Sequence, residues 1–387
     1  LYLFEIISLI DNLELLKFEN CGATSLLENS LIPYLDTVIE RNKANPDTKT
    51  LRHFLVVNCN IELAKIISMI GSSFIKLTRV NLSGNKFTNL QVFQQQLEAS
   101  NEITFNNLDE LYLNNCKFTT ETFQAFFNMI SKPACSITSL HLDLMDFFIP
   151  RHSNRANTIV SKTDAEMSEK RSVVDNAGEN LGEAAYDLIK NIKLPSLMSL
   201  TWSQNRLSKI QTELLLIFLR NNNHIYELEF NEIVCDTDTF CSGFGRVNFI
   251  NLEKLAIQGS DMNKRNSENA QPLTPPPLPP KNHSEQSPPS LIPSARAKPI
   301  ARYTIRSSSV TTDVISEANF SFGPKLLQLL SPLTQLKYLD ITNQRIGDGV
   351  IPFLNGLLQQ ATIQELYFDG QLIQNCDAYL QLLKDII

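Results

Sequence analysis

The sequence predicts an α/β fold: a curved, horseshoe-shaped solenoid with parallel strands on its concave side and helices on its convex side. Three observations predict it. The nine-residue pattern L-x-x-L-x-L-x-x-N/C recurs ten times. The steps between first residues are 38, 26, 31, 29, 60, 28, 27, 84 and 27 residues, and a period in the range of most of these steps is typical of stacked repeats. A helical spacing of apolar residues follows the pattern.

Each copy of the pattern predicts one strand. Side chains alternate between the two faces of a strand, so the fourth and sixth positions enter a shared core. The third, fifth and seventh positions then line an open surface. The copies span residues 13–21, 51–59, 77–85, 108–116, 137–145, 197–205, 225–233, 252–260, 336–344 and 363–371.

The last position of the pattern predicts how the chain leaves each strand. Asn and Cys can hydrogen bond to backbone groups at such a turn. In copies that end in another residue, the pattern predicts the turn less firmly. The Asn and Cys positions are Asn85, Asn205, Cys21, Cys59 and Cys116, and the departures are Met145, Ile233, Ser260, Gln344 and Gln371.

A helix is predicted after each strand. In the fourth copy Phe123, Phe126, Phe127 and Ile130 fall at i, i+3, i+4 and i+7, which places them on one stripe of a helix. We interpret this stripe as core rather than as a cofactor site.

These features resemble the leucine-rich repeat family, and the unit length resembles its ribonuclease-inhibitor-like subclass. The resemblance covers nearly the whole chain outside the two long steps. It implies units that bury their apolar faces only against their neighbours. The sequence begins and ends in helical patterns, so we expect a piece of a longer array.

The two long steps divide the chain into five segments. Residues 150–180 are polar and predict a flexible insertion, and residues 261–318 hold ten of the 18 prolines and predict a disordered one. Residues 1–149, 181–260 and 319–387 carry the N-terminal, middle and C-terminal repeats.

The proline-rich insertion contains a candidate ligand. Pro276, Pro279 and Lys281 fit P-x-x-P-x-K, which resembles an SH3-domain ligand, and residues 276–279 (PPLP) resemble a WW-domain ligand. The alternative is a plain spacer. Ser309 lies three residues after Arg306 and is a candidate phosphorylation site, with a solubilising linker as the alternative.

The open surface is the other candidate site. Its predicted positions carry eight acids against three bases, together with several tyrosines, which give a large contact area at small entropic cost. We therefore expect a protein or peptide partner of basic character, with a generic solvated face as the alternative. The candidate contact residues are Glu110, Tyr112, Asp143, Glu227, Glu229, Tyr338, Asp340, Glu365, Tyr367 and Asp369.

The sequence does not favour a catalytic or metal-binding site. The five histidines and seven cysteines show no spacing typical of a metal site, and no phosphate-binding loop or nucleophile motif is found. His141 is expected to be a lone surface histidine. We expect no catalytic residue, cofactor or small-molecule substrate, and the net charge of -7 disfavours nucleic acid.

The predicted function is a non-catalytic scaffold that binds one partner on the concave face and offers its prolines to an SH3 or WW protein. Repeats beside proline-rich ligands are similar to the CARMIL family of cortical actin regulators, although that family keeps its prolines beyond the repeats. The alternative is a GTPase regulator resembling the Ran GTPase-activating proteins. The expected location is the cytoplasm, at the cell cortex if the CARMIL resemblance holds, with membrane contact only through segments outside this sequence.

Overall fold

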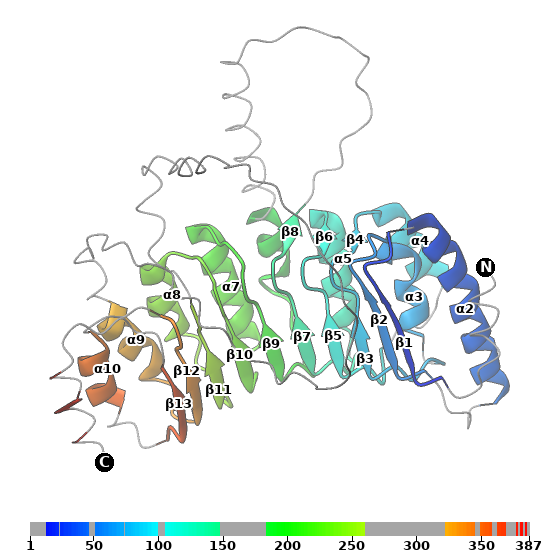
Figure 1. Cartoon of the computed structure of the whole chain (residues 1–387). Coiled ribbons are helices and arrows are strands. Elements are labelled where there is room, and N and C mark those ends of the chain that lie inside the picture. The colour runs from blue at the N-terminus through cyan, green and yellow to red at the C-terminus, as the bar shows by residue number, and fades with distance from the viewer. Residues whose placement is uncertain are drawn as a thin grey trace, which may run out of the picture.

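The computed structural model describes residues 13–22, 24–45, 51–72, 74–99, 105–147, 183–259, 322–344, 349–357 and 362–368, together with residues 377, 380, 381 and 384. These ranges form an α/β protein with a ten-stranded parallel sheet, and the helices gather on one side of it (Figure 1). The predicted α/β class is confirmed.

The strands of the large sheet follow one another in chain order, and a second sheet of three short strands lies at the edge where the chain leaves the large one. The large sheet contains β1 (Leu15–Glu19), β2 (His53–Val57), β3 (Arg79–Asn81), β5 (Glu110–Tyr112), β7 (Ser139–His141), β9 (Ser199–Thr201), β10 (Glu227–Glu229), β11 (Lys254–Ala256), β12 (Tyr338–Asp340) and β13 (Glu365–Tyr367). The small sheet contains β4 (Lys86–Phe87), β6 (Lys117–Phe118) and β8 (Asp146–Phe147).

Helices connect the strands, and successive helices contact one another from α7 to α10. They are α2 (Thr24–Ala44), α3 (Ile67–Ile70), α4 (Leu90–Ala99), α5 (Thr120–Ile130), α7 (Lys209–Asn221), α8 (Thr237–Phe244), α9 (Phe322–Leu330) and α10 (Val350–Leu357), with a 3-10 helix η1 (Leu63–Lys65) and a further helical stretch at 183–189.

The register places equivalent positions of the repeated pattern beside one another. Third positions pair with third positions even across the two long steps, where Ser139 pairs with Ser199 and Lys254 pairs with Tyr338. The strands on either side of each predicted insertion are therefore direct neighbours, in the same phase. The insertions themselves, 150–180 and 261–318, lie outside the described residues.

The core forms between the sheet and the helices, as the alternation predicts. In β5 and the residue after it, Leu111 and Leu113 are 0% and 1% exposed. The predicted stripe of α5 is buried, and Phe123 and Phe127 pack with ring centroids 4.7 Å apart. Thr119 caps this helix by accepting from the backbone of Thr122, whose side chain in turn accepts from the backbone of Thr119.

The turns after the strands confirm part of the prediction. The buried Asn205 amide donates to the carbonyls of Leu142 (2.9 Å) and Ser203 (3.1 Å) and accepts from the backbone N–H of Met145 (2.8 Å). The Cys116 thiol donates to the Leu82 carbonyl at 3.3 Å. Both residue types bond to the backbone at the predicted place.

The turns in the copies without Asn or Cys follow the same backbone path as the others. The eighth position is left-handed in all nine copies in which the structure describes it, with φ between 52° and 73°. Gln344 takes over part of the role of Asn: its amide donates to the Ile257 carbonyl, but its buried side-chain oxygen accepts no hydrogen bond from the described residues. The left-handed residues are Asn20, Asn58, Gly84, Asn115, Leu144, Gln204, Glu232, Gly259 and Asn343.

Candidate functional site

The open face is the face of the large sheet that points away from the helices, and three rows of side chains cross it. The pairing of the strands aligns the third and fifth positions across the sheet, and backbone hydrogen bonds at the strand ends extend the alignment to the seventh position. The third-position row is Leu15, His53, Arg79, Glu110, Ser139, Ser199, Glu227, Lys254, Tyr338 and Glu365. The fifth-position row is Lys17, Leu55, Asn81, Tyr112, His141, Thr201, Glu229, Ala256, Asp340 and Tyr367. The described seventh-position row is Glu19, Val57, Ser83, Asn114, Asp143, Ser203, Asn231, Gln258 and Thr342.

Both bases in the N-terminal half of the open face are paired with acids. Lys17 Nζ lies 2.6 Å from a carboxylate oxygen of Glu19, and Arg79 Nε lies 3.2 Å from one of Glu110. The pairs are half exposed, so each stabilises the fold by at most about 1 kcal/mol. Their main effect is that this half presents little net charge.

An aromatic stack extends from the Arg79–Glu110 pair. The Arg79 guanidinium lies 5.0 Å from the centre of the Tyr112 ring, and the His141 ring stacks on Tyr112 with centroids 4.0 Å apart and planes 5° apart. The Tyr112 hydroxyl donates to Glu110 at 2.9 Å, and the Ser139 hydroxyl lies 3.1 Å from His141 Nε2. Sequence reasoning missed this cluster because its members come from three different copies.

The expectation that His141 is a lone surface histidine is wrong. It is half-buried against Tyr112, and burial lowers its pKa to about 4. The charge of Glu110 opposes that shift and the charge of Arg79 adds to it. At neutral pH the ring is therefore uncharged and adds no positive charge to the open face.

The C-terminal half of the open face carries unbalanced negative charge. From β9 to β13, the third and fifth positions hold four acids, Glu227, Glu229, Asp340 and Glu365, and one base, Lys254. Lys254 Nζ lies 3.8 Å from Glu227, so the one base is beside an acid already.

The pKa of the Glu229 carboxyl reflects both its burial and this negative charge. Burial raises the pKa of its carboxyl, and the charges of Glu227, Asp143 and Asp340 raise it further, against the opposing charge of Lys254. A cation that reached this region would relieve the repulsion.

Two tyrosines border the acidic region at the end of the sheet. The rings of Tyr338 and Tyr367 lie 5.3 Å apart, and Tyr367 is 49% exposed. Burial raises the pKa of Tyr338 to about 12, and the charge of Asp340 raises it as well. The Tyr338 hydroxyl therefore stays protonated at neutral pH and donates to Asp340 at 3.4 Å.

Asp340 does not belong among the residues that can contact a partner directly. Its position on the open face was predicted correctly, but its side chain is only 5% exposed. One carboxylate oxygen accepts from the Thr342 backbone N–H (2.9 Å), and the other accepts from the amide of Gln258. The buried Asp340 carboxylate therefore adds negative charge to the open face without being exposed on it.

Asp143 has a structural role that the sequence did not suggest. In the seventh-position row, three successive side-chain oxygens accept from the backbone N–H of the next copy: Asn114 from Asp143 (3.1 Å), Asp143 from Ser203 (2.7 Å), and Ser203 from Asn231 (3.0 Å). Burial raises the pKa of Asp143, and the bond from Ser203 opposes that shift. The carboxylate is thus part of a ladder that holds the strand ends together.

The remaining predicted site residues fall outside the described residues. These are Asp369, the proline-rich ligand residues Pro276, Pro279 and Lys281, and Ser309. Among the residues that the structure does describe, no group of three or more His, Cys, Asp or Glu side chains could hold a metal ion.

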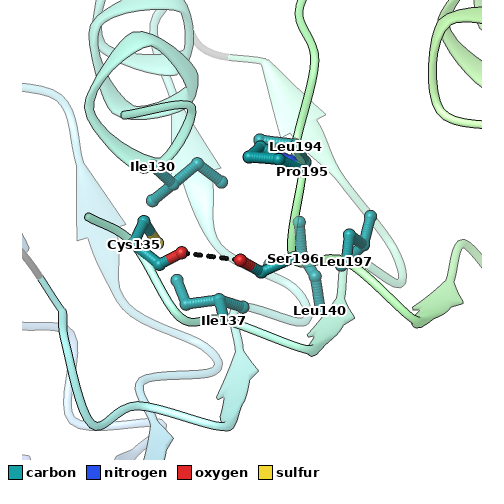
Figure 2. A pocket seen from close by; sticks show the side chains of 8 residues that line it. All are labelled: Ile130, Cys135, Ile137, Leu140, Leu194, Pro195, Ser196 and Leu197. Carbon is teal, nitrogen blue, oxygen red and sulfur yellow. Dashed lines mark hydrogen bonds between the residues drawn. The ribbon is translucent and has the colours of Figure 1, made fainter. Parts of the chain in front are cut away.

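One small hollow lies away from the open face, between the end of α5 and the loop before β9 (Figure 2). It is lined mainly by apolar side chains, including Ile130, Leu140 and Leu194. A hydrogen bond spans the hollow, in which the Ser196 hydroxyl donates to the Cys135 carbonyl at 3.0 Å. Its polar groups are satisfied within the protein, so the hollow offers a ligand little to recognise.

No protein-family model matches the chain, and no curated protein is similar to it. None of the described helices is long and apolar enough to cross a membrane.

Proposed function

We propose that the protein is a non-catalytic interaction scaffold built as a leucine-rich-repeat solenoid of the ribonuclease-inhibitor-like kind. The half of its open face formed by β9 to β13 binds a protein segment rich in Lys or Arg. The proposal includes the proline-rich segment as a second docking site for an SH3 or WW protein.

The observation that carries this proposal is the distribution of charge across one continuous sheet. In the N-terminal half, Lys17 and Arg79 each lie beside an acid, whereas the C-terminal half keeps an excess of acids after Lys254 is paired with Glu227. Burial raises the pKa of Glu229, and the neighbouring acids Glu227 and Asp340 raise it further. A generic solvated face would spread its charges without such a division.

The side chains beside these acids can accommodate a peptide rich in Lys or Arg. Ser199 and Thr201 are small and lie between the Tyr112–His141 stack and the acids Glu227 and Glu229. Small residues leave room for the long side chain of Lys or Arg to lie flat, with its charge directed to a carboxylate. Tyr367 adds exposed aromatic area at the far end.

A peptide-selection experiment tests the proposal. Random peptides displayed on phage are selected on the full chain, and their affinities for E227Q/E229Q/E365Q are compared with those for the wild type by fluorescence anisotropy. Exposed charge pairs contribute roughly 0.2–1 kcal/mol each, so we expect about a threefold to hundredfold loss of affinity for the triple variant.

The control variant is E98Q/E121Q/E213Q, which removes the same charge from exposed positions on α4, α5 and α7. Its affinity should stay close to that of the wild type. Selected peptides without a basic bias, or equal losses in the two triple variants, would refute the proposal.

A further inference from the structure

Two cysteines occupy equivalent places in the first two copies of the repeated pattern. Cys21 follows Asn20 (φ 56°) and Cys59 follows Asn58 (φ 52°), so the chain takes the same path out of each strand. Glu19 and Val57 are Cα partners at the ends of β1 and β2, and the Asn20 N–H donates to the Val57 carbonyl at 2.9 Å.

This shared path keeps the two cysteines at the spacing of neighbouring strands. That spacing is about 5 Å. A disulfide needs Cα atoms roughly 4.4–6.8 Å apart, and the usual spacing of neighbouring strands falls within that range. Each thiol also points the same way, donating to the carbonyl two residues earlier: Cys21 to Glu19 at 3.7 Å and Cys59 to Val57 at 3.3 Å.

Cys21 lies close enough to Cys59 to shift the pKa of its thiol. Burial raises the pKa of the Cys59 thiol, the backbone N–H of Cys21 opposes that shift by hydrogen bonding to it, and the Cys21 thiol raises it again by its charge and a hydrogen bond. Neither thiol is oxidised in the structure.

The two thiols differ in access. Cys21 is half-buried, whereas Cys59 is 0% exposed. A reagent from solution therefore reaches Cys21 first. Cys116 holds the same place in the fourth copy, but the preceding copy has Asn85 there, so it has no such neighbour.

We propose that Cys21 and Cys59 form a thiol–disulfide exchange site for low-molecular-weight disulfides such as oxidised glutathione. The Cys21 thiolate attacks one sulfur of glutathione disulfide; that S–S bond breaks, one glutathione thiolate leaves, and a mixed disulfide forms on Cys21. Cys59 then gives its proton to water and attacks the Cys21 sulfur, which expels the second glutathione thiolate. Two protein thiols are oxidised to the Cys21–Cys59 disulfide, and glutathione disulfide is reduced to two thiols.

The test treats the reduced full chain with oxidised glutathione, blocks the remaining thiols by alkylation, and maps the peptides by mass spectrometry. The wild type and C116S should give the Cys21–Cys59 cross-link. C59S should accumulate a glutathione adduct on Cys21, and C21S should leave Cys59 unmodified. A C21S protein modified at Cys59 as fast as the wild type reacts, a persistent adduct on wild-type Cys21, or pairing of either residue with another cysteine would overturn the proposal.

A second measurement does not depend on the folding of the variants. Phenylarsine oxide bridges two neighbouring thiols, so the reduced wild type should bind it and thereby protect Cys21 and Cys59 together from alkylation. Protection of neither residue, or of only one, would contradict the paired arrangement.

Discussion

Replacing Asn205 with Ala should destabilise the protein strongly, because this one side chain holds the turn between two copies separated by the first long step. Asn205 is 4% exposed. Its loss leaves the Leu142 carbonyl and the Met145 N–H without the bonds of 2.9 and 2.8 Å that it makes to them. The Ser203 carbonyl keeps its bond from the Leu144 N–H at 3.1 Å.

The expected loss follows from those two groups. An unsatisfied buried backbone group costs about 1–3 kcal/mol. Met145 is half-buried, so water can reach its N–H. The loss of stability for the two groups together should therefore fall in the lower part of their summed range, at about 2–4 kcal/mol.

Urea unfolding followed by tryptophan fluorescence measures this loss. Trp202 is the only tryptophan and is fully buried, and its Nε1–H donates to the Tyr186 hydroxyl at 3.0 Å. The fluorescence of Trp202 therefore reports on the turn that Asn205 holds. N128A removes an exposed asparagine from α5 and should change stability by less than about 0.5 kcal/mol. If N205A lies within 1 kcal/mol of N128A, the role assigned to the buried amide is refuted.

Three further predictions concern strain and titration. L144N should raise the free energy of unfolding by about 0.5–1 kcal/mol, since Leu144 is held at φ 52° while 46% exposed and Asn tolerates that conformation better; a lower thermal midpoint would contradict this. E229Q should raise the thermal midpoint at pH 7.5 but not at pH 4 or below. The raised pKa of Glu229 means that the folded state holds the proton more tightly than the unfolded state. Ionisation of Glu229 therefore costs stability only as the pH rises past the ordinary pKa of 4.5. An E229Q midpoint below that of the wild type at pH 7.5 would be inconsistent with repulsion. His141 should titrate near pH 4 by NMR, and its lowered pKa should cost stability as pH falls from 6.5 towards 4, a loss that H141Q removes; a midpoint near 6.5 would rule out its burial in the stack.

The sequence predicted the strands and their order well, because that information repeats. Apolar residues at the fourth and sixth positions define the buried face of every strand, and the shared phase of the copies sets the register. The same periodicity predicted which side chains line the open face, including Tyr112, Glu227 and Glu229.

What the sequence did not predict depends on neighbours from other copies. The stack of Arg79, Tyr112 and His141 joins three copies, and no spacing along the chain marks it. Asp340 is buried because Gln258 and Tyr338 contact its carboxylate, although its pattern position is the same as that of half-buried Glu229. Pattern position therefore gives the face of a residue but not its exposure.

The left-handed eighth position could have been found from the sequence in part. Asn or Gly occupies it in six of the nine described copies, and both residues tolerate positive φ. Leu144, Gln204 and Glu232 break that rule, so composition alone hides the regularity there.

Hydrogen–deuterium exchange of the full chain, with and without a selected basic peptide, locates the binding surface on the sheet. We expect slower exchange in β9 to β13, from Ser199–Thr201 to Glu365–Tyr367, and unchanged exchange in β1 to β3 and in the helices α4 and α5. Protection confined to the helices, or centred on β1 to β3, would contradict the assignment of the acidic half of the open face as the binding surface.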